Sequence, residues 1–261
     1  MHIGNLDAGY ESLKTYLPLE EAYVLYGNLF VRPHRCLTLV EMADEHRPRV
    51  IGSYLKGMPF HAFTCHLFAE EDEYDFADMV ERFRQELPFP PAGTAQGVVT
   101  VAEKLVRRLN IPAIESKQTM LLMKLTDTQR LLPPGGSRLV TEQEAAAAAK
   151  LAVQIGMVSF QPEELVTMPH LALYADTEPV ALAGFHVFTE EFVEIGNIGT
   201  AVAHQKKGLG SQITSDICRL ALERAPAVYL CVFADNSAAI HVYRKLGFAE
   251  VERYSFVTFG L

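Results

Sequence analysis

The stretch Glu194-Ile-Gly-Asn-Ile-Gly-Thr200 runs into Gln205-Lys-Lys-Gly-Leu-Gly210, and these two segments decide the fold of the C-terminal half. The first predicts a strand rich in glycine, and the second predicts a turn that opens an apolar helix. Further along the chain come Tyr229-Leu-Cys-Val-Phe233 and then Asn236-Ser-Ala-Ala239. A helix start preceded by glycines presents unpaired backbone amides and a positive dipole end, which suits a phosphate group.

In this order, Gln-x-x-Gly-x-Gly after a strand and Asn-x-x-Ala-x-x-x-Tyr-x-Lys-x-Gly-Phe after the next one resemble the GNAT superfamily of acyl-CoA N-acyltransferases. The resemblance implies an α/β fold with a mixed, mostly antiparallel sheet. Its central pair of parallel strands, residues 192–200 and 227–233, would be splayed. It also implies acetyl-CoA, or a short acyl-CoA, as co-substrate and no metal.

Residues 206–211 are expected to hold the pyrophosphate, because Gly208 and Gly210 let the backbone approach closely and Lys206 and Lys207 add positive charge. The segment does not match the dinucleotide-binding fingerprint, because that pattern requires a third glycine where this chain has Ile213. The competing interpretation is a strand-to-helix turn with exposed lysines. The cofactor-binding residues implied by the resemblance are Ile198, Gly199, Thr200, Gln205, Lys206, Lys207, Gly208, Leu209, Gly210, Ser211, Asn236 and Ala239.

Gly196 and Gly199 weaken a purely structural strand, which favours close approach by a ligand. The backbone amides of Ile198 to Thr200 would hold the thioester carbonyl and stabilise the developing oxyanion. The alternative is a buried central strand that happens to contain glycines.

Two side chains are candidates for proton chemistry. Glu194 stands eleven residues before Gln205, where histone-type GNAT enzymes carry their catalytic glutamate; the alternative is an exposed charge beside Glu190 and Glu191. Tyr243 would protonate the leaving thiolate or donate a hydrogen bond to its sulfur, and core packing is its alternative role. His204 and Cys231 are weaker candidates. Ribosomal-protein N-terminal acetyltransferases place a glutamate where this chain has Cys231, so the chain departs from that subgroup.

Composition limits the partners. Up to residue 130 the chain has 14 basic and 18 acidic residues, and afterwards 9 and 14, so both halves are mildly acidic. This balance argues against a nucleic acid or an anionic membrane as partner. No apolar run is long enough for a membrane span, and the first residues do not resemble a signal peptide. The four cysteines are scattered, which predicts reduced thiols in a cytoplasmic protein.

Residues 131–137, Leu-Leu-Pro-Pro-Gly-Gly-Ser, predict an interdomain linker. We expect a catalytic GNAT domain at 138–261 and a smaller α/β domain at 1–130. In the domain at 138–261 we expect strands at 138–140, 171–174, 180–188, 192–200, 227–233 and 248–259, and helices at 145–149, 210–224 and 236–246. Thr141 and Glu144 predict a capping box.

The N-terminal half is less regular. We expect helices at 19–30, 74–87 and 98–110 and strands at 50–55, 60–69 and 114–125. Two of its stretches, 23–30 and 115–123, loosely resemble glycine N-acyltransferase-like proteins. This half is either a degenerate copy of the same fold without a cofactor site or an unrelated appended domain.

The predicted function is direct transfer of an acyl group from CoA to a primary amine in a ternary complex. The alternative is a non-catalytic acyl-CoA-binding or sensing module. The acceptor would be a small-molecule or peptide amine selected by loops such as 156–169, and the protein a monomer or homodimer. No metal site is expected.

Overall fold

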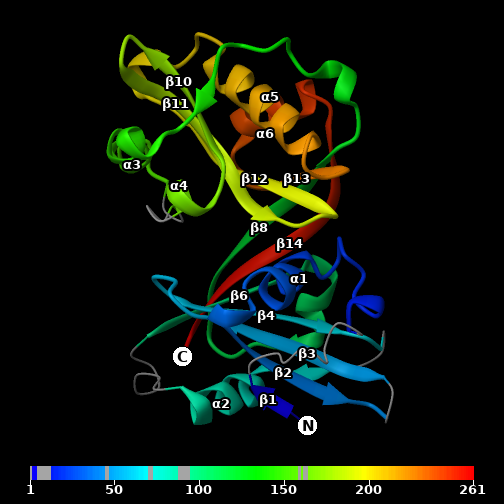
Figure 1. Cartoon of the computed structure of the whole chain (residues 1–261). Helices are drawn as coiled ribbons and strands as arrows, with labels where there is room; N and C mark the ends of the chain where they lie inside the picture. Colours follow the sequence, from blue (N-terminus) through cyan, green and yellow to red (C-terminus); the bar gives the residue numbers. More distant parts are fainter. Residues whose placement is uncertain are drawn as a thin grey trace. The chain divides into compact units, whose positions relative to one another are not determined.

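A computed structural model of the chain describes residues 2–4, 13–44, 47–69, 73–87, 95–157, 160 and 164–261. Its residues form two compact units: Met1–Leu121 with Glu252–Leu261, called unit 1, and Leu122–Val251, called unit 2. Figure 1 shows the chain coloured along its sequence. No helix of the described residues is long and apolar enough to cross a membrane.

Unit 2 contains one mixed sheet. Its strands follow the order β8-β13-β12-β11-β10-β9. Pairing is antiparallel from β9 to β12 and parallel between β12 and β13. The bounds of these strands are β9 Arg138–Leu139, β10 His170–Ala175, β11 Glu178–Phe188, β12 Phe192–Thr200 and β13 Ala227–Phe233.

Helices cover both faces of this sheet (Figure 1). They are α3 Ala145–Gln154, α4 Glu164–Thr167, α5 Leu209–Leu222 and α6 Ser237–Lys245. Helix α3 packs Ala148, Leu151 and Ala152 against Ala172 and Leu182, forming one core cluster. The capping box predicted at Thr141 and Glu144 is confirmed.

Unit 1 carries a sheet in the order β1-β2-β3-β4-β6-β14. Here too the sheet is mostly antiparallel, with one parallel pair, β4 and β6. The bounds are β1 His2–Gly4, β2 Cys36–Met42, β3 Pro48–Leu55, β4 His61–Leu67, β6 Gln96–Ala102 and β14 Phe248–Gly260, with a separate pair β5 Tyr74–Asp75 and β7 Leu109–Asn110.

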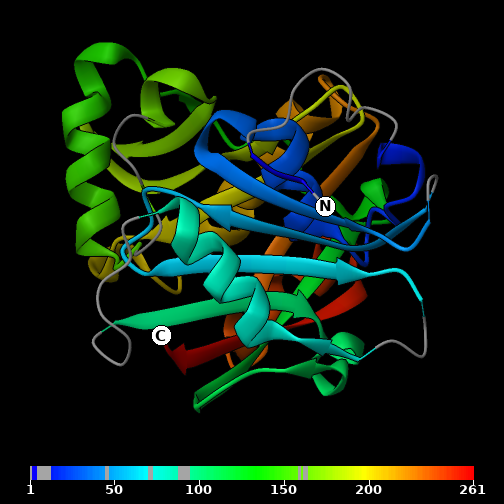
Figure 2. The same cartoon turned by 90° about the horizontal axis from the view of Figure 1, so that it is seen from below.

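Helix α2, Phe76–Glu86, lies over this sheet (Figure 2). Its buried residues Phe76, Met79 and Phe83 join Phe63 and Val99 in the core on that side. Helix α1, Tyr23–Tyr26, continues as a π-helical segment, Gly27–Val31, and packs Leu25 and Leu29 in a second core cluster. The unit is therefore a sheet with a packed layer on each face.

Two helices predicted for this half differ from the structure. The helix predicted at 98–110 is wrong, because the segment forms β6 and then a 3-10 helix, Glu103–Arg108. Val98, Val99 and Val101 are β-branched and all buried, which suits a strand covered on both faces. Strand β2 was not predicted, and the helix at 19–30 is shorter than expected.

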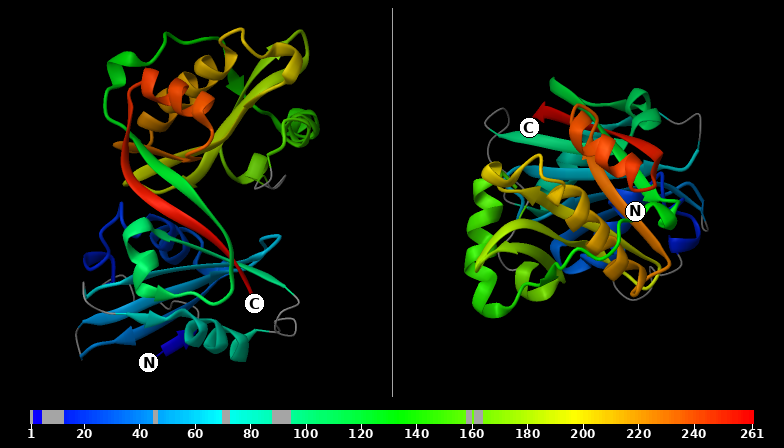
Figure 3. Two further views of the ribbon diagram at one scale, coloured as in Figure 1. Left: turned by 180° about the vertical axis from the view of Figure 1, so that it is seen from behind. Right: turned by 90° about the horizontal axis from the view of Figure 1, so that it is seen from above.

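Two strands contribute residues to both units. Strand β8, Ile114–Leu125, crosses from unit 1 to unit 2 at Leu121, and β14 returns from unit 2 to unit 1 after Val251. The two strands lie side by side (Figures 1 and 3). The last part of β14 pairs with β6 from Tyr254 to Gly260, so unit 1 is completed by the end of the chain.

The Pro-Gly segment that predicts a linker lies within unit 2, along α5. Arg219 donates hydrogen bonds to the carbonyl oxygens of Leu131 and Leu132, at 3.2 and 2.8 Å from Nη2. Gln212 Nε2 donates to the Pro133 carbonyl at 2.8 Å. These side chains satisfy carbonyl groups that two prolines and two glycines leave outside any ladder.

Candidate active site

Strands β12 and β13 begin as neighbours and then stop pairing. Their parallel register joins Phe192 to Ala227, Val193 to Val228 and Glu194 to Tyr229, and no further pair is recorded between them in the described chain. On its other edge β12 stays paired with β11 as far as Thr200. From Ile195 onward, β12 therefore stays paired with β11 on one edge, while its pairing with β13 on the other edge has ended.

A β-bulge interrupts β12 in this stretch. Gly196 pairs with Gly184 and Gly199 pairs with Leu182, so two residues of β12 lie opposite one residue of β11. Asn197 has a φ of 51°, in the left-handed region that asparagine tolerates better than most residues. A bulge of this kind bends the strand and turns backbone groups away from the regular ladder.

The bulge also changes which residues share a face. By simple alternation Gly196, Ile198 and Thr200 would lie together. Instead Gly196 and Gly199 pair with Gly184 and Leu182, which lie on one face of β11, while Thr200 pairs with Ala181 on the other. Simple alternation would also place Glu194 on the face of Thr200, and the bulge separates them.

Neighbouring side chains fill the space beside the two glycines of β12. A Cβ added at Gly199 would meet the side chains of Ile155 and Met157, and one at Gly196 would lie 3.1 Å from the Cβ of His186. Packing therefore accounts for both glycines. Their presence does not by itself indicate a ligand on that face.

The turn before α5 has the geometry of an anion site. Lys206 and Gly208 both have left-handed φ values, 61° and 82°. Gly208 is the N-cap of α5, with no side chain capping the helix, and the first helical bond runs from Gln212 N to Gly208 O at 3.0 Å. The amides of Leu209 to Ser211 precede that bond, at the positive end of a helix of 14 residues. The lysines at 206 and 207 are exposed.

The end of β12 and the start of α5 are held together. Gln205 Nε2 donates a hydrogen bond to the Thr200 carbonyl at 3.3 Å. A Cβ added at Gly210 would lie 3.7 Å from Thr200 Oγ1, and Thr214 Oγ1 donates to the Gly210 carbonyl at 2.7 Å. The stretch without a β13 neighbour thus ends beside the helix start.

Glu194 lies at the last point where β12 and β13 pair. Its side chain is buried, with 8% of its surface exposed, which differs from the exposed acidic turn that was the alternative prediction. The Cys231 thiol is hydrogen-bonded to the Glu194 carboxylate. Burial, and then the negative charge of Glu194, raise the pKa of the Cys231 thiol well above its usual range.

Tyr243 and Asn236 come from α6. The Tyr243 side chain is buried, its ring centroid is 6.0 Å from that of Phe248, and burial raises the pKa of its phenol to about 12. Asn236 is exposed and caps α6, accepting a hydrogen bond from the Ala239 amide at 3.2 Å. The oxygen of this amide side chain serves its own helix, while its nitrogen remains a donor.

The corresponding helix start in unit 1 is built differently. Strands β4 and β6 also pair in parallel over three residue pairs, His61–Phe63 with Gly97–Val99, and α2 follows β4 as α5 follows β12. Here Asp75 caps the helix with its carboxylate, which accepts from the Ala77 amide at 3.0 Å. A carboxylate at this point disfavours a phosphate by charge and occupies one of the donors. Residues 70–72, which precede this helix start, lie outside the described chain.

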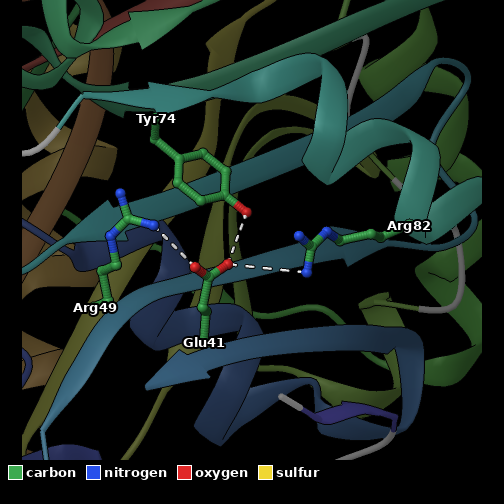
Figure 4. Close-up of polar contacts among 4 residues, drawn as sticks. All are labelled: Glu41, Arg49, Tyr74 and Arg82. Atoms are coloured by element: carbon green, nitrogen blue, oxygen red, sulfur yellow. Dashed lines mark hydrogen bonds and ion pairs between the residues drawn. The ribbon is translucent and has the colours of Figure 1, made fainter. Parts of the chain in front are cut away.

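A closed polar cluster stands beside that helix (Figure 4). The Glu41 carboxylate receives Arg49 Nη1 at 3.0 Å, Arg82 Nη1 at 3.9 Å and the Tyr74 hydroxyl at 3.4 Å. Burial and the nearby Glu41 raise the pKa of Tyr74 to about 12. The two arginines neutralise Glu41 and join β2 to β3 and α2, while the Tyr74 hydroxyl joins β2 to β5, which is a structural role.

The other reactive side chains are cysteines and candidate metal ligands. Cys36, Cys65 and Cys218 are buried free cysteines, whereas Cys231 is partly exposed as a residue although its thiol group is buried. Within the described ranges, no group of three or more His, Cys, Asp or Glu side chains could hold a metal ion. Residues 158–159 and 161–163, part of the loop expected to select the acceptor, are outside the described chain.

Comparison with known proteins agrees with this geometry. Residues 138–248 match the family model of the acetyltransferase (GNAT) family. This segment of the chain is therefore similar to the GNAT acetyltransferases. The matched part runs from β9 to the start of β14 and so contains β12, α5, β13 and α6.

Among characterised proteins, a mycothiol acetyltransferase of Gordonia bronchialis is 36% identical over 111 residues, which is 41% of this chain and 34% of that protein. A second one, from Corynebacterium efficiens, is 40% identical over 81 residues, 28% of this chain and 26% of that protein. The chain therefore spans about a third or less of the length of these relatives.

Solved structures extend the likeness to the whole chain. A GCN5-related N-acetyltransferase from Kribbella flavida has a TM-score of 0.61 and 18% identity, covering 92% of this chain and 95% of that one. A tandem GNAT protein from the clavulanic acid biosynthesis pathway has a TM-score of 0.59 and 14% identity, covering 99% and 98%. At such identities the likeness shows the fold alone, and it shows a GNAT-like fold across both units.

Two features of this site, the bulge at Asn197 and the Cys231–Glu194 pair, are not among the features predicted from the sequence. The bulge at Asn197 has a signal in the Gly196-Asn197 dipeptide, since both residues accept unusual backbone conformations. The pairing of Cys231 with Glu194 has no local signal, because it depends on the register of two strands distant in sequence.

Proposed function

We propose that unit 2 transfers an acetyl or short acyl group from CoA to the primary amine of an acceptor. One observation supports this most. The stretch of β12 that β13 no longer accompanies ends beside an open, glycine-bounded helix start. An extended pantetheine arm can pair with such a strand edge as another strand would, while the pyrophosphate occupies the helix start.

In this proposal the backbone of the loop and of α5 binds the phosphates, with Gln205 to Ser211 as the contacting residues. Lys206 and Lys207 add charge from the exposed side of the turn. The amides of Ile198, Gly199 and Thr200, at and after the bulge, hold the thioester carbonyl oxygen. Such donors are worth about 3 kcal/mol each in comparable oxyanion holes. The Asn236 amide nitrogen and the space beside Ala239 serve the arm.

Glu194 is the proposed general base. An amine is mostly protonated at neutral pH and has to lose a proton before it attacks the carbonyl carbon. The buried Glu194 carboxylate accepts that proton, directly or through a water. As the new C–N bond forms, the C–S bond breaks and CoA leaves as a thiolate.

Tyr243 is proposed to donate a hydrogen bond to the leaving sulfur. A phenol with a pKa of about 12 would surrender its proton to a thiolate only uphill, since free thiols have pKa values near ~8.5. A hydrogen bond from the neutral phenol stabilises the thiolate without full transfer. Of the two functions that sequence suggests for Tyr243, the raised pKa favours this one.

The acceptor is proposed to be a small molecule or peptide amine. Both partially matching relatives are named mycothiol acetyltransferases, which makes small thiol-bearing amines a first choice for a screen. The net charge of −9 makes cationic amines a second choice.

Calorimetric titration of acetyl-CoA into the full chain tests the cofactor part, with free CoA and ATP as comparisons. We expect binding of both CoA species and none of ATP at the same concentrations. Release of free thiol in the presence of an amine panel tests the transfer. No heat with acetyl-CoA at millimolar concentration would refute the proposal, and binding without turnover on any amine would favour a sensing module.

A further inference from the structure

The register of β12 and β13 places the Cys231 side chain on the same face of the sheet as Glu194. Tyr229 is the parallel partner of Glu194, and Cys231 is two residues further along β13, so all three side chains lie on one face. The ring contact between Phe192 and Tyr229, with centroids 5.7 Å apart, lies on the same face and fixes the two strands there. Immediately beyond this point the strands stop pairing.

The thiol and the carboxylate form a donor–acceptor pair. A buried carboxylate needs hydrogen-bond donors, because burial without them costs several kcal/mol. The Cys231 thiol supplies one, and burial together with the nearby negative charge keeps this thiol protonated. A protonated thiol is a donor and a poor nucleophile, so this environment does not suit an acyl-enzyme on Cys231.

We infer that Cys231 is a positioning residue that holds the Glu194 carboxylate at the point where β12 and β13 separate. The inference rests on the proposed function for the role of Glu194 as base. A hydrogen bond to the ionised carboxylate favours the charged form and fixes its orientation toward the separated strands. The residue thereby links the base to β13, the strand on the far side of the proposed cofactor slot.

Other charged and titratable groups face this pair from neighbouring elements. Lys124 Nζ of β8 lies 5.1 Å from the centroid of the Tyr229 ring. His186 of β11 lies at the second irregularity of the β11–β12 ladder and beside Gly196. Variants of Lys124 and His186 therefore belong in the same pH series, so that a change assigned to Cys231 is separated from theirs.

The first experiment measures thiol reactivity and requires no substrate. Iodoacetamide labels the full chain over a pH series, and peptide mass spectrometry follows Cys231 against the buried Cys36, Cys65 and Cys218. In Glu194→Gln the negative neighbour is lost while burial remains, so the pKa of the thiol falls and labelling at pH 8 should be faster than in the wild type, since the rate follows the thiolate fraction. Glu190→Gln, the same change on an exposed neighbour, should label like the wild type.

The second experiment uses acetyl-CoA and whichever amine is turned over. Cys231→Ser keeps a donor, and Cys231→Ala removes it. We expect Cys231→Ala to lower kcat about tenfold with little change in KM for acetyl-CoA, and to move the acid limb of the kcat/KM profile to higher pH. Cys231→Ser should restore most of the rate and the wild-type pH profile.

The outcomes separate the inference from the proposed function. Equal labelling rates in wild type and Glu194→Gln, or equal losses in Cys231→Ser and Cys231→Ala, would overturn the positioning role. Faster labelling in Glu194→Gln without acetyl-CoA binding would support the residue pair while refuting the acyltransferase. A Glu194→Gln chain that fails to fold leaves the serine–alanine comparison to decide.

Discussion

Gly136 and Gly208 share a left-handed backbone, with φ values of 81° and 82°, and a Cβ on either would meet no atom within 4 Å. Alanine at either position should therefore carry a similar conformational strain, about 1–2 kcal/mol. The two glycines differ in place: Gly136 lies in the segment along α5, and Gly208 is the N-cap of α5. They form a matched pair for separating strain from ligand binding.

Gly208→Ala should weaken acetyl-CoA binding about tenfold or more, because its methyl group would project at the proposed phosphate position. Gly136→Ala should leave the affinity unchanged. Calorimetry measures both, and thermal denaturation checks that the two variants lose comparable stability. Equal affinities in the two variants would contradict a phosphate site at the start of α5.

Tyr243→Phe should lower kcat about tenfold to a hundredfold without changing the pH dependence of the rate between pH 6 and 9. The phenol, with a pKa of about 12, stays protonated throughout that range. The ring keeps its contact with Phe248, so the melting temperature should change little. A wild-type rate that falls as pH rises through 10 and follows Tyr243 would contradict the neutral-phenol role.

Tyr243 also predicts a pH dependence of stability. Its folded pKa is raised above the unfolded value of about 10, so its contribution to stability is fully present below pH 10 and is lost as the pH rises toward 12. Wild type should therefore lose more unfolding free energy between pH 10 and 12 than Tyr243→Phe. Urea denaturation at a series of alkaline pH values measures the difference, and parallel curves would contradict it.

Arg219→Ala should lower the free energy of unfolding by about 1–3 kcal/mol, because it removes the donors to the Leu131 and Leu132 carbonyls. Arg224→Ala makes the same charge change on an exposed residue just after α5 and should cost about 0.5 kcal/mol or less. Denaturant titrations compare them. Similar losses would show that the segment 131–135 contributes no stability through these bonds.

Phe259→Ala should destabilise unit 1 by about 3–5 kcal/mol. Phe259 is fully buried, with ring centroids 5.4 Å from Phe76 and 5.9 Å from Phe63, although only two residues follow it in the sequence. Phe188→Ala, at a position 40% exposed, is the control and should cost far less. Hydrogen exchange of α2 and β6 would locate the loss, and unchanged protection there would contradict the prediction.

The pairing of β14 with β6 also limits which fragments of the chain can be tested. A fragment of residues 137–261 retains the end of β14 but lacks β6, its partner from Tyr254 to Gly260. Val257 and Phe259 would then leave the core in which they are buried. A fragment that ends at Val251 avoids this exposure, but it removes the final strand from unit 1 and so cannot report on the intact chain.

Much of unit 2 could be predicted from the sequence, for local reasons. The prolines, glycines and caps at Thr141, Gly208 and Asn236 act within a few residues of themselves, so the strands and helices they bound were predicted close to their observed limits. The N-terminal half was harder. Val98 and Val101 lie at helical spacing, and only their burial on both sides of a sheet made β6 a strand.

By itself, the sequence determined the order of the elements in unit 2, the open glycine-bounded start of α5, and the different, self-capped helix start at Asp75 in unit 1. These features depend on backbone conformations and hydrogen bonds between residues close along the chain. Tertiary structure alone decided that the parting of β12 and β13 begins directly after Glu194, that Cys231 meets that carboxylate, and that the last strand completes unit 1. Each of these depends on the register between strands far apart in the sequence, which is set by the packing of whole sheets and by no local signal.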